Sequence, residues 1–291
     1  MHKELQKLRD AYGLCRQTCQ AEMSCSEANA ALKQLVSMAL RFLEEKCTRT
    51  DLVSRVAGKE YMAFRRKDAP GGISRPANAA LFRPDADAVV GKWEDLVQGL
   101  LPEKDLAQMF YTACLAPCLA MELFDRQNKK GPATFFECMI GHVFSRVLRC
   151  DPQKSVTLDL EGMKARMTMD FLFHLSEKRR LHLAVKMSSR ERVVQAWAHQ
   201  KVLDAAYGLR AYTGVMVLFA ETKLASKSLE VIEVCVPDQW LVYQSFLAQM
   251  ERIYYFDIPQ RYLTLTLEHP TLIHIKPFAH FFTEKDQVLG R

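Results

Sequence analysis

The chain has 291 residues, of which 49% are hydrophobic and 25% are charged, so it can bury a sizeable core. It contains no run of about 18 apolar residues, which argues against a membrane span. Its first residues lack the apolar stretch of a secretory signal. Forty Lys and Arg against 34 Asp and Glu give a net charge of +6, which is compatible with a polyanionic partner but does not establish one.

Nine cysteines are scattered along the chain, and none forms a CxxC pair or has zinc-finger spacing. In a chain without a secretory signal, we expect them to be reduced thiols and the protein to be cytoplasmic. The sequence also lacks glycine-rich phosphate-binding motifs and a GxSxG motif, which argues against nucleotide-fuelled and acyl-transfer chemistry.

The first third of the chain is predicted to be mainly helical. Residues 1–65 form an expected N-terminal helical region, because segments such as 30–45 carry apolar residues at helical spacing without Gly or Pro. Residues 66–91 contain several Pro and Gly residues and are predicted to be a loop or connector. The main domain is expected over 92–291, with a C-terminal extension, and it begins with helices over 93–100 and 103–125.

A further helix is predicted over 135–149, with Thr134 as its N-cap. Glu137 lies three residues after Thr134, so the two residues match a capping box, in which the Glu side chain reaches back to the start of the helix.

From residue 155 the apolar period changes from 3.6 to 2, which is typical of strands. Segments 167–173 and 181–187 are predicted to pair as a β-hairpin around a polar turn. A helix is expected over 190–207, a strand buried on both faces over 213–220, a strand over 228–236 and a helix over 238–255. This order predicts an α/β fold, with a central mixed β-sheet flanked by helices.

The hairpin brings two charged side chains together. If its turn is centred on Lys178, Asp170 lies opposite Lys186 on the same face. Such a pair suits metal-assisted phosphodiester hydrolysis: Asp170 would bind Mg²⁺, and Lys186 would orient water or offset developing charge. The alternative is a structural cross-strand ion pair.

With the helix and buried strand that follow, these residues resemble type II restriction endonucleases with a PD-(D/E)xK nuclease core. The resemblance covers 134–220, and it implies a restriction-endonuclease-like fold for the domain over 92–291. In the segment 186–192, Lys-Met-Ser-Ser-Arg-Glu-Arg, a lysine is followed by a basic-acidic-Arg triplet, as in members that read CC/GG steps.

The resemblance implies that Arg190, Glu191 and Arg192 read DNA bases. Their chemistry suits this role, because Arg can donate two hydrogen bonds to guanine and Glu can accept one from cytosine. The alternative is that Ser188 and Glu191 form a capping box and that the two arginines are solvated.

The sequence departs from the family motif at its second acidic position, which is Ala184 here. Some members carry that carboxylate on the following helix instead, and their usual offset from the lysine falls here on His199 or Gln200. Neither residue is acidic, and hard cations such as Mg²⁺ prefer oxygen ligands. His199 is a candidate for acting on water or phosphate, or a packing residue, and Glu137 is a candidate for the missing metal ligand.

The resemblance implies a Mg²⁺-dependent endonuclease for double-stranded DNA, acting as a homodimer at a palindrome that contains CC/GG. A two-fold symmetric dimer presents one short readout element twice, as a palindrome requires. The rival interpretation is a sequence-specific DNA-binding protein with a degenerate nuclease core, and a third is an enzyme unrelated to DNA.

Overall fold

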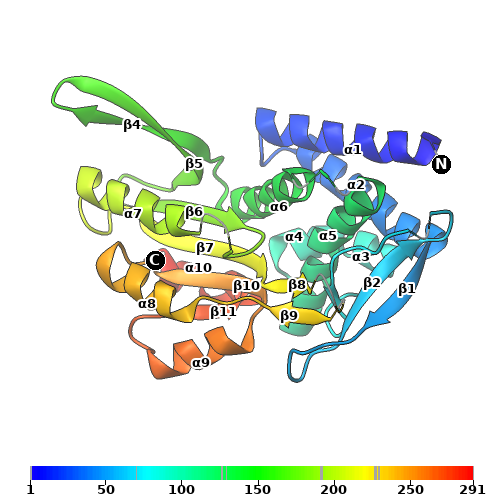
Figure 1. Ribbon diagram of the computed structural model, residues 1–291. Coiled ribbons are helices and arrows are strands. Elements are labelled where there is room, and N and C mark those ends of the chain that lie inside the picture. Colours follow the sequence, from blue (N-terminus) through cyan, green and yellow to red (C-terminus); the bar gives the residue numbers. More distant parts are fainter. Residues whose placement is uncertain are drawn as a thin grey trace. The chain divides into compact units, whose positions relative to one another are not determined.

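The computed structural model describes residues 2–69, 71–125, 127–128, 130–190, 193–225, 228 and 230–290 (Figure 1). The chain forms two compact units: unit 1 comprises Met1–Val147 and Thr222–Val234, and unit 2 comprises Leu148–Glu221 and Cys235–Arg291. The predicted boundaries at residues 65 and 91 both lie within unit 1.

Unit 1 is mainly helical and contains two small sheets. Its helices are α1 (His2–Ala21), α2 (Ser26–Lys46), α3 (Ala86–Gly91), α4 (Trp93–Gln98), α5 (Glu103–Phe124) and α6 (Lys130–Leu148). Its strands are β1 (Cys47–Leu52), β2 (Tyr61–Arg66) and β3 (Ala77–Asn78) in one antiparallel sheet, and β8 (Thr222–Leu224) and β9 (Val231–Glu233) in another.

The prediction that residues 1–65 are helical is therefore wrong beyond Lys46, where β1 and β2 form an antiparallel pair. Likewise, the segment 66–91 is not a plain loop, because it holds β3 and α3. Asp85 is the N-cap of α3, since its side chain accepts a hydrogen bond from the backbone N–H of Ala88.

Helix α5 is the described helix that is long and apolar enough to cross a membrane by length and composition. About 72% of its most apolar window is buried inside the structure, which is the pattern of a core helix. Its bounds agree with the helix expected over 103–125, and Pro117 lies inside it.

Unit 2 contains a six-stranded mixed sheet in the order β11-β10-β7-β6-β5-β4. Its strands are β4 (Gln153–Leu160), β5 (Met163–His174), β6 (Arg180–Lys186), β7 (Thr213–Ala220), β10 (Arg252–Asp257) and β11 (Ile275–Pro277). β4, β5 and β6 pair antiparallel, whereas β6, β7, β10 and β11 run parallel. β4 and β5 form a long hairpin that extends beyond the other strands (Figure 1).

Helices cover both faces of this sheet. The helices of unit 2 are α7 (Val194–Tyr207), α8 (Pro237–Phe246), α9 (Gln260–Glu268) and α10 (Phe281–Val288), with a short 3-10 turn at Phe278–His280. On one face, a buried cluster joins Ala184, Met216 and Tyr255 of the strands to Trp197 of α7 and Trp240 of α8. On the other face, the ring centroids of Phe256 and Phe278 are 4.6 Å apart and those of Tyr254 and Phe281 are 5.9 Å apart.

This architecture confirms the predicted α/β fold with a central mixed sheet flanked by helices. The strand over 213–220 has the predicted bounds and is buried along most of its length. The helix predicted over 238–255 is wrong in its second half: α8 ends at Phe246, and residues 252–257 form β10. Because β10 is buried on both faces, its apolar run lacks the alternation that marks a half-exposed strand.

Candidate active site

The hairpin of β5 and β6 brings Asp170 and Lys186 together, as the sequence predicts. Lys186 Nζ lies 2.6 Å from Asp170 Oδ2, and the same oxygen accepts a hydrogen bond of 2.9 Å from the backbone N–H of Val185. About one fifth of each charged side chain is exposed, so the pair is accessible from solvent.

The register of the hairpin differs from the predicted one. Phe171 lies opposite Leu183, and this register, continued by one residue, puts Ala184 rather than Lys186 level with Asp170. The turn is centred on Glu177 instead of Lys178. Because the period of a strand is two residues, Lys186 still projects on the face of Asp170 and reaches it diagonally.

Two histidines lie on the same side of the sheet as this pair. His182 is on β6, four residues before Lys186, and His199 is on α7, with 6.2 Å between their ring centroids. Burial lowers the pKa of His182 to about 4. Burial also lowers the pKa of His199, and the charges of Asp170 and Lys186 act on it in opposite directions. Both imidazoles are therefore neutral near pH 7.

Gln200 and His199, the two uncharged candidates for the position of the missing acid, have different surroundings. The Gln200 side chain is buried: its Oε1 accepts a hydrogen bond of 3.0 Å from His182 Nδ1, and its Nε2 donates to Asp204 and to the backbone oxygen of Tyr212. His199 is half-buried and lies where the charges of Asp170 and Lys186 reach it. A role of His199 at the site stays a prediction.

Ala184 is 2% exposed and belongs to the apolar cluster that contains Trp197. A carboxylate at this position would be buried among apolar side chains, which is costly without a cation. The apolar packing around position 184 therefore suits alanine better than an acidic residue.

The candidate base-reading residues follow the end of β6. Arg190 is exposed, in a turn, whereas Glu191 and Arg192 lie outside the described residues. Helix α7 begins at Val194, and among the described residues its N-cap, Val193, makes no side-chain capping hydrogen bond. Ser188 lies six residues before that start. The capping-box alternative pairs Ser188 with Glu191, which lies outside the described residues, so it stays untested.

Glu137 lies on α6 in unit 1 and is half-buried. The prediction that Thr134 caps this helix is wrong, because α6 already begins at Lys130 and Thr134 lies inside it. Asn128 accepts a hydrogen bond from the backbone N–H of Gly131 near this start. The capping role proposed for Glu137 is thus excluded, and its role as a metal ligand stays a prediction.

Sequence reasoning missed Glu221, one of the buried carboxylates of unit 2. It directly follows β7, whose carboxyl end lies at the same edge of the sheet as Lys186, since β6 and β7 are parallel. Its side chain is fully buried, and burial raises its pKa to about 7. A charged residue directly after an apolar strand was the available signal.

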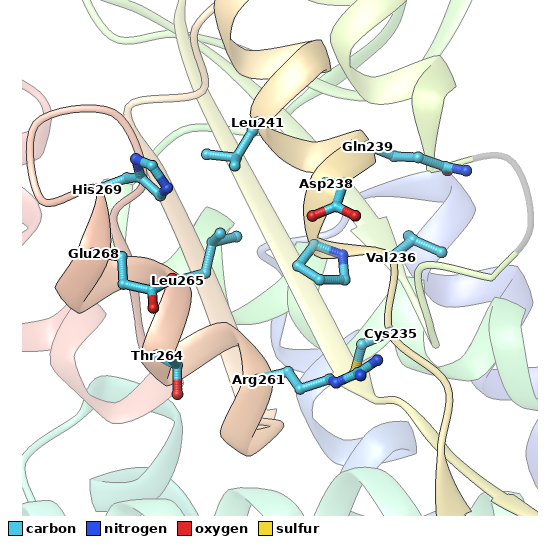
Figure 2. A pocket seen from close by; sticks show the side chains of 11 residues that line it. Cys235, Val236, Asp238, Gln239, Leu241, Arg261, Thr264, Leu265, Glu268 and His269 are labelled. Carbon is cyan, nitrogen blue, oxygen red and sulfur yellow. The ribbon is translucent and has the colours of Figure 1, made fainter.

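A groove of about 600 Å³ lies elsewhere in unit 2, between α8 and α9 (Figure 2). Its lining mixes acidic, basic and apolar side chains, including Asp238, Leu241, Arg261 and Glu268. Neither Asp170 nor Lys186 contributes to it, so the groove is distinct from the candidate active site.

No protein-family model and no curated protein matches the sequence. Among solved structures, the chain is similar to the type IIP restriction endonuclease Kpn2I, with a TM-score of 0.80 and 20% identity over 97% of each chain. The chain therefore has the restriction endonuclease fold. The complex of restriction endonuclease PspGI with substrate DNA aligns over 70% of this chain and 76% of its own, at 14% identity and a TM-score of 0.40, too low to support a conclusion.

Proposed function

We propose that the protein is a Mg²⁺-dependent, sequence-specific endonuclease that hydrolyses phosphodiester bonds of double-stranded DNA, as a type II restriction enzyme does. The observation that carries the proposal is the Asp170–Lys186 pair, with 2.6 Å between Nζ and Oδ2, on the central sheet of a restriction endonuclease fold. The fold alone does not define an activity, so the proposal depends on the chemistry of this pair.

The donor set supports a hard cation that takes most of its ligands from DNA and water. Mg²⁺ is usually held by one or two carboxylates together with substrate phosphate oxygens and water. Among the described residues no group of three His, Cys, Asp or Glu side chains is arranged to hold a metal. Asp170, which lies beside Lys186, is the proposed principal protein ligand. Asp170 Oδ2 accepts hydrogen bonds from Val185 and Lys186, and Oδ1 is the oxygen that we propose would bind the cation. Glu137 is the second proposed ligand.

Each side chain then has a defined task. A bound Mg²⁺ would polarise the scissile phosphate and activate water. Lys186, held by Asp170, would orient the attacking water or offset the charge that develops on the phosphate. His199 is neutral near pH 7 and is therefore able to accept a proton from water or to donate a hydrogen bond to phosphate.

The target would be a palindrome containing CC/GG, read by Arg190, Glu191 and Arg192 and cut by a homodimer in the cytoplasm. The support is the position of Arg190, four residues after Lys186 and exposed, which would put base reading and cleavage on one short segment. The similarity to a type IIP restriction endonuclease agrees with this proposal but does not define the site that is read.

The test is incubation of the purified chain with a large DNA of known sequence, with Mg²⁺ or with EDTA, followed by sequencing of the fragment ends. Discrete Mg²⁺-dependent fragments whose ends share a CC/GG-containing palindrome would support the proposed activity, its metal dependence and its target sequence. Asp170→Ala is expected to abolish cleavage and to retain binding. Light scattering of the free protein tests the homodimer.

A catalytically degenerate DNA-binding protein is the second candidate. Two observations favour it: Ala184 cannot bind a metal, and a neutral imidazole stands where an acid is expected. Intact DNA with and without Mg²⁺, together with tight binding to particular fragments, would support the binder. Absence of both cleavage and binding would refute the two candidates together.

A further inference from the structure

Glu221 stands beside the segment that joins the candidate catalytic lysine to the candidate base-reading residues. The backbone N–H of the preceding residue, Ala220, donates a hydrogen bond of 3.2 Å to the carbonyl oxygen of Met187. This bond extends the parallel pairing of β6 and β7 by one step beyond Lys186, and it brings the Glu221 side chain close to Ser189.

The carboxylate holds Ser189 by its backbone. Glu221 Oε1 accepts two hydrogen bonds of 2.7 Å, from the Ser189 backbone N–H and from the Tyr255 hydroxyl of β10. Both donors reach the same oxygen, and Oε2 is buried without a hydrogen-bond partner among the described residues.

A second contact holds the side chain of Ser189. Its Oγ lies 3.2 Å from the Tyr262 hydroxyl of α9, which also accepts a hydrogen bond of 3.2 Å from the backbone N–H of Val236. The rings of Tyr262 and Trp240 stack with 4.3 Å between centroids. Ser189 is therefore attached to the core of unit 2 through both its backbone and its side chain.

This arrangement is costly for stability, because burial of a carboxylate without a cation is unfavourable. Burial raises the pKa of Glu221, and the hydrogen bonds from Tyr255 and Ser189, with the nearby Arg190 charge, offset only part of that effect. An apolar residue of similar size would avoid the cost. An apolar residue, however, could not accept the hydrogen bond from the backbone N–H of Ser189. Ser189 lies three residues after Lys186 and immediately before Arg190.

We propose that Glu221 is a positioning residue that fixes the segment 187–190, and thereby sets the position of Arg190, the described base-reading candidate, relative to Lys186. This inference rests on the proposed endonuclease function. Its consequence is that Glu221 governs how strongly cleavage depends on the correct DNA sequence, because small displacements of catalytic or recognition groups cost large factors in rate.

The test compares single-turnover cleavage at the cognate site with cleavage at sites that differ by one base pair. Glu221→Leu removes the acceptor while filling its volume, and we expect the ratio of cognate to altered-site rates to fall by about tenfold or more. Glu221→Gln keeps an oxygen acceptor for both donors and is expected to retain the ratio. Binding to non-specific DNA, which depends on phosphate contacts, is expected to be unchanged in both variants.

The matched control is Glu284→Leu. Glu284 is also a buried carboxylate of unit 2 and accepts a hydrogen bond of 2.8 Å from Tyr254, the neighbour of Tyr255 on β10. Its described partners are Tyr254, Arg252 and Lys276, not Ser189. All variants are assayed at a temperature at which circular dichroism shows them folded. If Glu221→Leu does not fold, adding Tyr255→Phe removes the hydroxyl that it leaves unpaired.

Two results would overturn the proposal: an unchanged ratio in folded Glu221→Leu, or an equal loss in Glu284→Leu. Tryptic cleavage after Arg190 provides a readout that does not require nuclease activity. We expect Glu221→Leu to be cut there at least about tenfold faster than the wild type, and Glu221→Gln at the wild-type rate. If the wild type neither cuts nor binds DNA, the proposed function fails. In that case the proteolysis still reports whether Glu221 holds this segment.

Discussion

The pH dependence of stability offers a direct test of the buried carboxylate. Glu221 is fully buried, and burial raises its pKa from 4.5 to about 7. Below pH 4.5 the group is protonated in both folded and unfolded chains, so it causes no change of stability with pH. As the pH rises from 4.5 to 7, the unfolded chain loses a proton that the folded chain keeps, so stability falls. Each unit of difference between the folded and unfolded pKa corresponds to about 1.36 kcal/mol. The free energy of unfolding is therefore about 3 kcal/mol lower above pH 7 than below pH 4.5.

Glu221→Gln removes this titration and keeps an acceptor for Ser189 and Tyr255. We therefore expect the free energy of unfolding of the wild type, minus that of the variant, to fall by about 2–3 kcal/mol between pH 5 and pH 8. The assay is urea denaturation of both proteins, followed by circular dichroism at several pH values. Other titrating groups are common to both proteins and cancel in the difference.

Glu284→Gln is the control with the opposite sign. Burial raises the pKa of Glu284, but hydrogen bonds from Lys276 and Tyr254 and the charge of Arg252 outweigh it, and the net pKa is lowered. The contribution of Glu284 is therefore present above pH 4.5 and lost as the pH falls below it. Its difference curve should be flat from pH 5 to pH 8. A flat curve for Glu221→Gln over the same range would refute the reasoning.

Three further predictions concern the site and its support. Asp170→Asn removes the charge that would bind Mg²⁺ and is expected to lower the cleavage rate at least about a thousandfold while retaining DNA binding, measured by single-turnover cleavage and by gel shift in Ca²⁺. Gly214→Ala would place its Cβ 2.7 Å from Gln200 Oε1, so we expect a loss of about 1–3 kcal/mol in urea denaturation; an unchanged midpoint would contradict the packing. Ala184→Glu restores the acid of the PD-(D/E)xK motif but buries it in the apolar cluster that contains Trp197. We therefore expect a lower free energy of unfolding and no gain in Mg²⁺-dependent cleavage, and higher cleavage activity with unchanged stability would contradict this reasoning.

The alternation along the hairpin is local and was therefore readable from the sequence. This alternation predicted that Asp170 and Lys186 lie on the same face of the hairpin, and the structure confirms it. The pairing register is shifted by two residues from the predicted one, but a shift of two residues leaves each side chain on the same face of the sheet. The apolar run of β7 and the helix α5 were also predictable, since each depends on a continuous stretch of chain. The α/β architecture follows from the order of such elements.

Other features depend on pairing between segments far apart in the sequence, and only the tertiary structure decided them. β10 could not be told from a helix by its apolar run, and β8 and β9 pair within unit 1 although the chain around them belongs to unit 2. The place of Glu221 depends on the parallel pairing of β6 with β7 and of β7 with β10, which joins residues 32 and 34 positions apart. Local periodicity reports which face of an element is buried, but it does not report the neighbour that buries it.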